Sequence, residues 1–103
     1  MALNVRMPAF IVVASLALAA CAGAPVQEMS NARQAIKAAR DATGPSTAAP
    51  ASLIEAESLL NRAEDNLQKR AYKQARRDAI AARGKAAEAL SSTRTANDRN
   101  GAS

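Results

Sequence analysis

Residues 52–90 read "SLIEAESLLNRAEDNLQKRAYKQARRDAIAARGKAAEAL", and the spacing of apolar side chains in this stretch decides the fold. Apolar residues recur at intervals of three and four, which is the spacing of one helix face. The first stripe consists of Leu53, Ala56, Leu60, Ala63 and Leu67, and the second of Tyr72, Ala75, Ala79, Ala82, Ala86 and Leu90. The second stripe does not continue the phase of the first, so we predict that the chain folds back near Arg70 and Ala71.

Such a hairpin sets large side chains against small ones along much of its length. The expected opposed pairs are Leu67 with Ala75, Leu60 with Ala82, Ala56 with Ala86, and Leu53 with Leu90. Contacts of this kind suit close packing of antiparallel helices. Because neither glycine nor proline marks the turn, one continuous helix over residues 52–95 is the alternative to a hairpin over the same range.

A further helix is predicted before the hairpin, over residues 26–43. Its apolar stripe consists of Met29, Ala32, Ile36 and Ala39. Gly44 and Pro45 follow in the order typical of a helix end, and residues 44–51 form a Pro/Gly linker. Leu59 and Ile80 lie beside the two hairpin stripes, where we expect this first helix to dock. The predicted fold is therefore all-α, with three helices that include an antiparallel alanine-rich hairpin.

The hairpin has predicted limits at both ends. Ser52 and Glu55 have the spacing of a capping box, in which each side chain satisfies a free backbone amide of the first turn. This predicts that the second helix begins at Ser52. At the other end the sequence turns polar after Leu90, so we expect residues 96–103 to form a disordered tail.

The N-terminal residues have the pattern of a bacterial export signal. Residues 1–20 combine Arg6, an apolar stretch too short to span a bilayer, and small residues at the end. Leu18, Ala19 and Ala20 before Cys21 resemble the bacterial lipobox. That resemblance implies a diacylglycerol and an N-acyl lipid on Cys21, which becomes the first residue after cleavage, with residues 21–25 as a tether. It also implies an outer-membrane anchor with the body in the periplasm. Ordinary signal cleavage and a secreted periplasmic protein are the alternative.

Three segments of the body resemble a family of small alanine-rich bacterial lipoproteins with a helical domain of unknown function, DUF4398. They are "ARQAIKAARDA" at residues 32–42, "AAPASLIEAESLL" at 48–60 and "AEDNLQKRAYKQARRDAIAA" at 63–82. The last segment is also similar to half of a tetratricopeptide-like hairpin, although the glycine usual at such a turn is replaced near Arg70. The resemblance implies a helical fold and an envelope address, and it implies no activity.

The residue composition argues against an enzyme. The chain has no histidine, and its single cysteine cannot form a disulfide within the chain. We find no metal-ligand cluster, no glycine-rich phosphate loop and no partner for a nucleophilic serine in the sequence. We therefore expect no catalytic residue, no bound metal and no cofactor beyond the lipid on Cys21.

The notable charge cluster lies in "KRAYKQARR", residues 69–77. Its basic residues are Lys69, Arg70, Lys73, Arg76 and Arg77. They form a candidate anion-binding face for peptidoglycan or lipopolysaccharide, with an ordinary solvated helix surface as the alternative. A nucleic-acid partner is not expected.

The functional expectation is a lipid-anchored, non-catalytic interaction or scaffold module. It would bind an envelope protein or a second copy of itself, because self-association would reinforce a thin alanine-rich core. The first alternative is an envelope-polymer binder that uses the basic face. A weaker alternative is a small envelope-perturbing lipoprotein of the toxin type.

Overall fold

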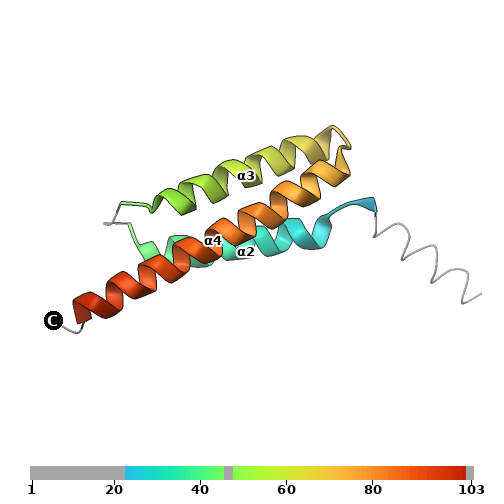
Figure 1. Cartoon of the computed structure of the whole chain (residues 1–103). Coiled ribbons are helices and arrows are strands. Elements are labelled where there is room, and N and C mark those ends of the chain that lie inside the picture. The colour runs from blue at the N-terminus through green and yellow to red at the C-terminus, as the bar shows by residue number, and fades with distance from the viewer. Residues whose placement is uncertain (1–22, 46–47, 102–103) are drawn as a thin grey trace, which may run out of the picture.

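The described part of the chain is a bundle of three α-helices. The computed structural model describes residues 23–45 and 48–101. Helix α2 spans Val26–Thr43, α3 spans Ala51–Gln68 and α4 spans Tyr72–Gly101, and no strand occurs in these two ranges. The chain runs up α2, back along α3 and up again along α4, so that α2 and α4 run parallel (Figure 1). The predicted all-α fold with an antiparallel hairpin is confirmed.

The turn between α3 and α4 is a Schellman motif built without glycine. The amide of Ala71 donates to the carbonyl oxygen of Asn66 at 2.8 Å, and the amide of Arg70 donates to that of Leu67 at 3.0 Å. Arg70 takes the left-handed conformation that this motif requires, with φ of 59°. The chain therefore reverses where the stripes change phase, and the alternative of one continuous helix is wrong.

We predict that replacing Arg70 with glycine stabilises the hairpin. A left-handed backbone costs an L-amino acid roughly 1–2 kcal/mol, and glycine is free of this cost. Alanine at the same position removes the same charge but keeps the strain. Thermal unfolding followed by circular dichroism should therefore give a higher midpoint for Arg70→Gly than for Arg70→Ala. Equal midpoints for the two variants would contradict the strained turn.

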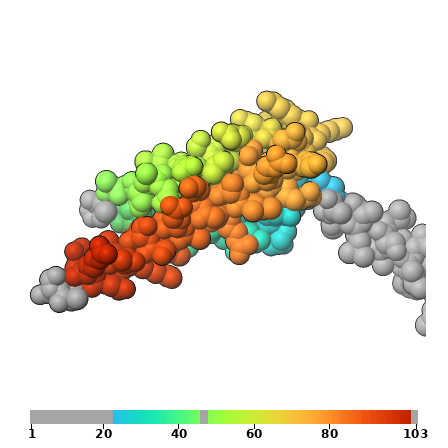
Figure 2. Space-filling model, in the orientation of Figure 1, coloured from blue at the N-terminus to red at the C-terminus, as the bar shows by residue number. Residues whose placement is uncertain are grey.

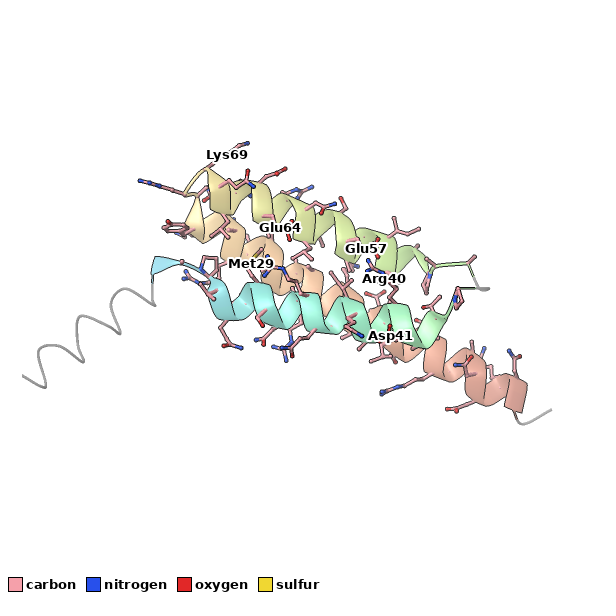
Figure 3. All side chains as sticks on the ribbon, turned by 180° about the vertical axis from the view of Figure 1, so that it is seen from behind. Met29, Arg40, Asp41, Glu57, Glu64 and Lys69 are labelled. Atoms are coloured by element: carbon pink, nitrogen blue, oxygen red, sulfur yellow. The ribbon has the colours of Figure 1, made fainter. Side chains whose placement is uncertain are left out.

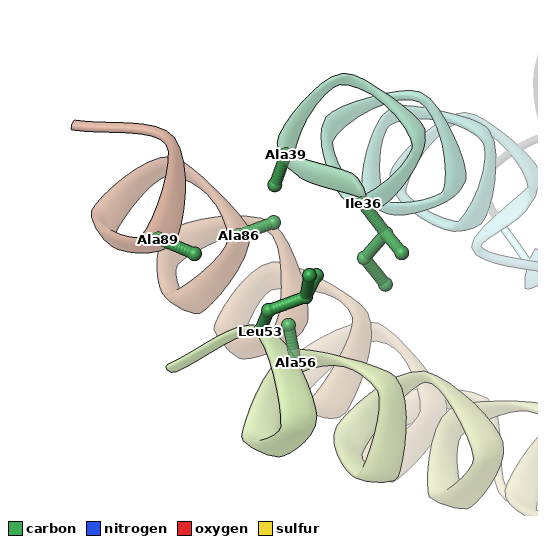
Figure 4. Packing of buried hydrophobic residues seen from close by; sticks show 6 residues of the cluster. All are labelled: Ile36, Ala39, Leu53, Ala56, Ala86 and Ala89. Carbon is green, nitrogen blue, oxygen red and sulfur yellow. The ribbon is translucent and has the colours of Figure 1, made fainter. Parts of the chain in front are cut away.

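Two clusters of buried side chains hold the helices together. The cluster nearer the hairpin turn contains Met29, Ala32, Ala63, Ala79 and Ala82. The other contains Ile36, Ala39, Leu53, Ala56, Ala86 and Ala89, which Figure 4 shows converging from all three helices. Leu60 packs partly buried against both clusters. Because alanine is short, the helix backbones approach closely along these contacts.

The start of α3 differs from its prediction. Helix α3 begins at Ala51, after Pro50, and no side chain caps it. The carbonyl oxygen of Pro50 accepts hydrogen bonds from the amides of Leu53 at 3.0 Å and Ile54 at 3.2 Å. The capping box of Ser52 and Glu55 is therefore wrong: with Pro50 leading into the helix, Ser52 already lies inside the first turn.

We expected the helix at residues 26–43 to dock beside Leu59 and Ile80, and the structure agrees for one of these two residues. Leu59 is partly buried against the cluster near the turn, as expected. Ile80 instead faces solvent, with 57% of its surface exposed. It directly follows the buried Ala79, and one residue turns a helix by about 100°, enough to move a side chain out of the seam.

Helix α4 also runs further than predicted. It continues through Gly101, where the polar sequence predicted a disordered tail over residues 96–103. The Oγ1 atoms of Thr93 and Thr95 donate to the carbonyl oxygens of Ala89 and Ser91, at 2.9 and 3.0 Å. Adding a residue to an existing helix is far easier than nucleating one, so the packed part of α4 extends the helix into polar sequence.

Candidate functional site

The hairpin turn and the first turns of α4 carry the predicted basic cluster. Lys69 and Arg70 lie in the turn, and Lys73 and Arg77 lie four residues apart on α4; all four are exposed. The turn lies at the same end of the bundle as the start of α2 (Figure 2). The structure therefore brings the predicted residues together at one end of the molecule, next to the N-terminal end of the described chain.

Arg76 has a different role from its four neighbours. Its Nε atom lies 3.3 Å from Oε1 of Glu28, and both side chains are about one-third exposed. Glu28 lies in the first turn of α2, so this ion pair ties the start of α2 to the start of α4. We therefore assign Arg76 to the assembly of the bundle rather than to the candidate anion-binding face.

Several cations elsewhere on the bundle are paired with acids. Arg40 pairs with Glu57, and Arg33 with Glu64 at 3.4 Å, so that α2 and α3 are linked twice. Figure 3 shows Arg40 and Glu57 directed toward each other, whereas Lys69 lies at the far end of the hairpin. These pairs are exposed, and each stabilises the fold only slightly.

Lys85 links α3 to α4 in a similar way. Its Nζ atom lies 3.6 Å from Oε2 of Glu55 and 3.4 Å from Oε2 of Glu88. The charge of Glu55 and then that of Glu88 raise the pKa of Lys85 above the ordinary lysine value. Lys85 is thus occupied by acids of its own chain.

The four cations at the turn have no such partners within the described residues. No acidic side chain lies within ion-pair distance of Lys69, Arg70, Lys73 or Arg77 in residues 23–45 and 48–101. Lys69 lies at the end of α3, where its backbone amide donates to the carbonyl oxygen of Asp65 at 3.1 Å. We call Lys69, Arg70, Lys73 and Arg77 the basic tip.

Neither a metal site nor a membrane span is found in the described chain. No group of three acidic or cysteine side chains there could hold a metal ion. None of the described helices is long and apolar enough to cross a bilayer. The predicted lipobox residues Leu18, Ala19 and Ala20 and the predicted lipid attachment site Cys21 lie outside the described residues.

Comparison with known proteins identifies the family. The family model for the domain of unknown function DUF4398 matches residues 27–102. The chain belongs to this family. The DUF4398 match covers α3 and α4 completely and α2 from its second residue, which confirms the resemblance to this domain seen in the alanine-rich segments. Comparisons with curated proteins and with solved structures gave no match.

Sequence reasoning missed two features of the DUF4398 surface. The first is the pairing of Arg76 with Glu28, which depends on how α2 docks and has no local signal. The second is an exposed stripe on α4, formed by Ile80, Gly84 and Ala87. Their spacing of four and three residues is a signal for a second helix face, but the spacing alone does not show that α2 and α3 leave this face of α4 uncovered.

Proposed function

We propose that this protein is a lipid-anchored helical module of the bacterial cell envelope that works without catalysis, by associating with proteins and first of all with a second copy of itself. The export signal and lipobox in residues 1–21 support the anchor. The described body begins directly after them, with α2 starting at Val26. Association would therefore take place close to the membrane surface.

The observation that carries this proposal is the exposed stripe on α4. The described core is built mostly from alanine, yet Ile80 stands outside with 57% of its surface exposed. Gly84 lies one turn further, and a Cβ atom added there would meet no other atom within 4 Å. Ala87 completes a narrow face on which a second helix backbone could approach closely. Small residues flanked by one aliphatic side chain suit helix–helix packing.

Two anchors in one leaflet would set the two copies parallel. The α4 helices would then meet along Ile80, Gly84 and Ala87 of each chain. Such a contact would add apolar burial to a bundle that has little of its own, and small domains gain stability from association for this reason.

We predict that Gly84→Arg weakens this association by about tenfold or more, because it would place an unpaired charge in an apolar contact. The free surface around Gly84 leaves room for the side chain, so the helical content of the monomer should not change. Crosslinking in cells and the measured mass of the detergent-solubilised protein read out the association.

Gln34→Arg is the matched control. It adds the same charge at an exposed position of α2, away from the stripe, and should leave association unchanged. A strictly monomeric wild-type protein without any crosslinked partner would reject the proposal. Equal association of the two variants would reject the stripe as its site.

Two further roles stay predictions. The basic tip, which has no acidic partner among the described residues, favours an anionic ligand. This supports the alternative that the protein binds peptidoglycan or lipopolysaccharide. An envelope-perturbing role of the toxin type has no supporting feature in the described surface. Overexpression without harm to the cell would argue against it.

A further inference from the structure

The basic tip lies at the same end of the bundle as the start of α2, which follows the predicted lipid attachment site Cys21 in the chain. Pro25, just before α2, is fully buried, and the ion pair of Glu28 with Arg76 holds the first turn of α2 beside the first turn of α4. Cys21 precedes Pro25 by four residues, and a chain of that length reaches at most about 14 Å. A lipid on Cys21 would therefore hold this end of the bundle, rather than the far end of α4, at the membrane surface.

The four cations of the basic tip leave an excess of positive charge at this end, because the glutamates of the described chain pair with other cations. Each glutamate of the described chain lies in an ion pair with Arg33, Arg40, Arg76 or Lys85. Near the turn, the carboxylate of Asp78 accepts a hydrogen bond from Asn66 at 2.9 Å. Asp65 remains as the acid in the last turn of α3, against four exposed cations. The tip thus carries a net positive charge that its own chain does not neutralise.

Two details of the same end fit contact with a lipid surface. Arg70 occupies the left-handed turn position at which glycine would be free of strain, so the chain keeps a charge there at a cost to the backbone. Val26 begins α2 at this end and is 69% exposed, the most exposed large aliphatic side chain of the described residues. Cations next to an exposed aliphatic side chain are the composition that the interface of a bilayer favours.

We infer that the basic tip is a membrane-docking surface: Lys69, Arg70, Lys73 and Arg77 bind the phosphate head groups of anionic phospholipids in the leaflet that holds the acyl chains of Cys21. This inference rests on the lipid anchor of the proposed function. Each basic residue at an anionic surface strengthens binding about fivefold, and salt screens the effect. The tip would fix the orientation of the bundle, with α4 directed away from the membrane, whereas the lipid alone leaves the body free to rotate.

Lysine reactivity tests the docking on the full acylated protein. The protein is reconstituted in vesicles of phosphatidylcholine, with or without phosphatidylglycerol, and labelled with an amine-reactive reagent. We expect Lys69 and Lys73 to react about fivefold more slowly in the anionic vesicles at low salt, and to recover at high salt. Lys37 lies midway along α2 and serves as the internal reference, with an unchanged rate. Equal rates for Lys69 in the two kinds of vesicle would overturn the inference.

Charge reversal supplies the second arm. The double variant Lys73→Glu with Arg77→Glu should lose the protection of Lys69 in anionic vesicles. Arg83→Glu is the matched control, because Arg83 is also exposed on α4 but lies further from the tip. It should keep the protection. Protection of Lys69 that survives the double variant would overturn the role of the tip.

Further arms separate the docking from the anchor and from other anions. Flotation with neutral vesicles reports the anchor alone. Loss of this flotation would overturn the anchor and the docking with it, whereas flotation without protection of Lys69 would overturn the docking alone. Protection that appears only with vesicles containing lipopolysaccharide, or only with isolated peptidoglycan sacculi, would overturn the assignment to phospholipid.

Discussion

Replacing Leu53 with alanine is expected to lower the free energy of unfolding by about 2–5 kcal/mol, which is the cost of removing a buried leucine side chain. Leu53 is 2% exposed and lies between Ile36 of α2 and Ala86 and Ala89 of α4. A domain of this size has a total stability of roughly 4–12 kcal/mol. The variant should therefore lose a large share of its stability, which urea unfolding followed by far-ultraviolet circular dichroism would measure.

The size of this effect follows from how few large side chains the core contains. Of the buried hydrophobic residues in the described chain, Met29, Ile36 and Leu53 are larger than alanine, and the other nine are alanines. An alanine core brings the helices close together but buries little area per residue. Each of the three large side chains therefore contributes a larger fraction of the free energy of unfolding than one leucine does in a core with many large side chains.

The next residue supplies a matched control. Ile54 is 59% exposed, so Ile54→Ala removes a similar aliphatic side chain from the surface and should change the stability by no more than about 0.5 kcal/mol. Alanine is also the better helix former, which acts in the opposite direction to any loss of contact. If both variants unfold at the same urea concentration, the packing of Leu53 in the core is contradicted.

The hairpin could be predicted because apolar residues at regular spacings within one short stretch of sequence indicate its two helices. Ala56 and Ala86 share a cluster, and Leu60 packs against the cluster that contains Ala82, as the opposed stripes predicted. The phase shift at Arg70 revealed the turn even without glycine, since a stripe that changes phase cannot stay on one face of a straight helix. The same logic missed Ala89, which is buried beside the predicted Leu90.

The helix boundaries and the third helix depend on information that the stripes do not carry. Ser52 and Glu55 have a valid capping spacing, yet Pro50 determines where α3 begins. Ile80 directly follows the buried Ala79. Which of these two side chains α2 covers depends on where α2 docks, and the stripes do not give that position. The pairing of Arg76 with Glu28 joins segments far apart in the chain. For this reason the sequence showed a run of basic residues at 69–77 but could not show that Arg76 pairs with Glu28, whereas the other four cations have no acidic partner among the described residues.

Replacing Cys21 with alanine is expected to abolish lipid attachment and leave an unprocessed precursor. The thiolate is the nucleophile to which the diacylglyceryl group would be transferred, and the chain has no second cysteine that could replace it. Without acyl chains the proposed anchor would lack the hydrocarbon burial that makes such anchoring stable, about 0.8 kcal/mol for each methylene. Palmitate labelling in cells, the electrophoretic size of the product and flotation with membranes would all report the loss.

The position of Cys21 makes this test separable from folding. The first of the described helices, α2, begins at Val26, and the described buried clusters start at Met29, so Cys21→Ala should leave the unfolding midpoint of the body unchanged. Ala22→Asp serves as the matched control: it alters the neighbouring residue, keeps the thiol, and should preserve labelling and processing. By resemblance to the sorting signal of bacterial lipoproteins, it should move the protein to the inner membrane. Labelling and processing that persist in Cys21→Ala would overturn the anchor, and with it the placing of the basic tip at a membrane surface.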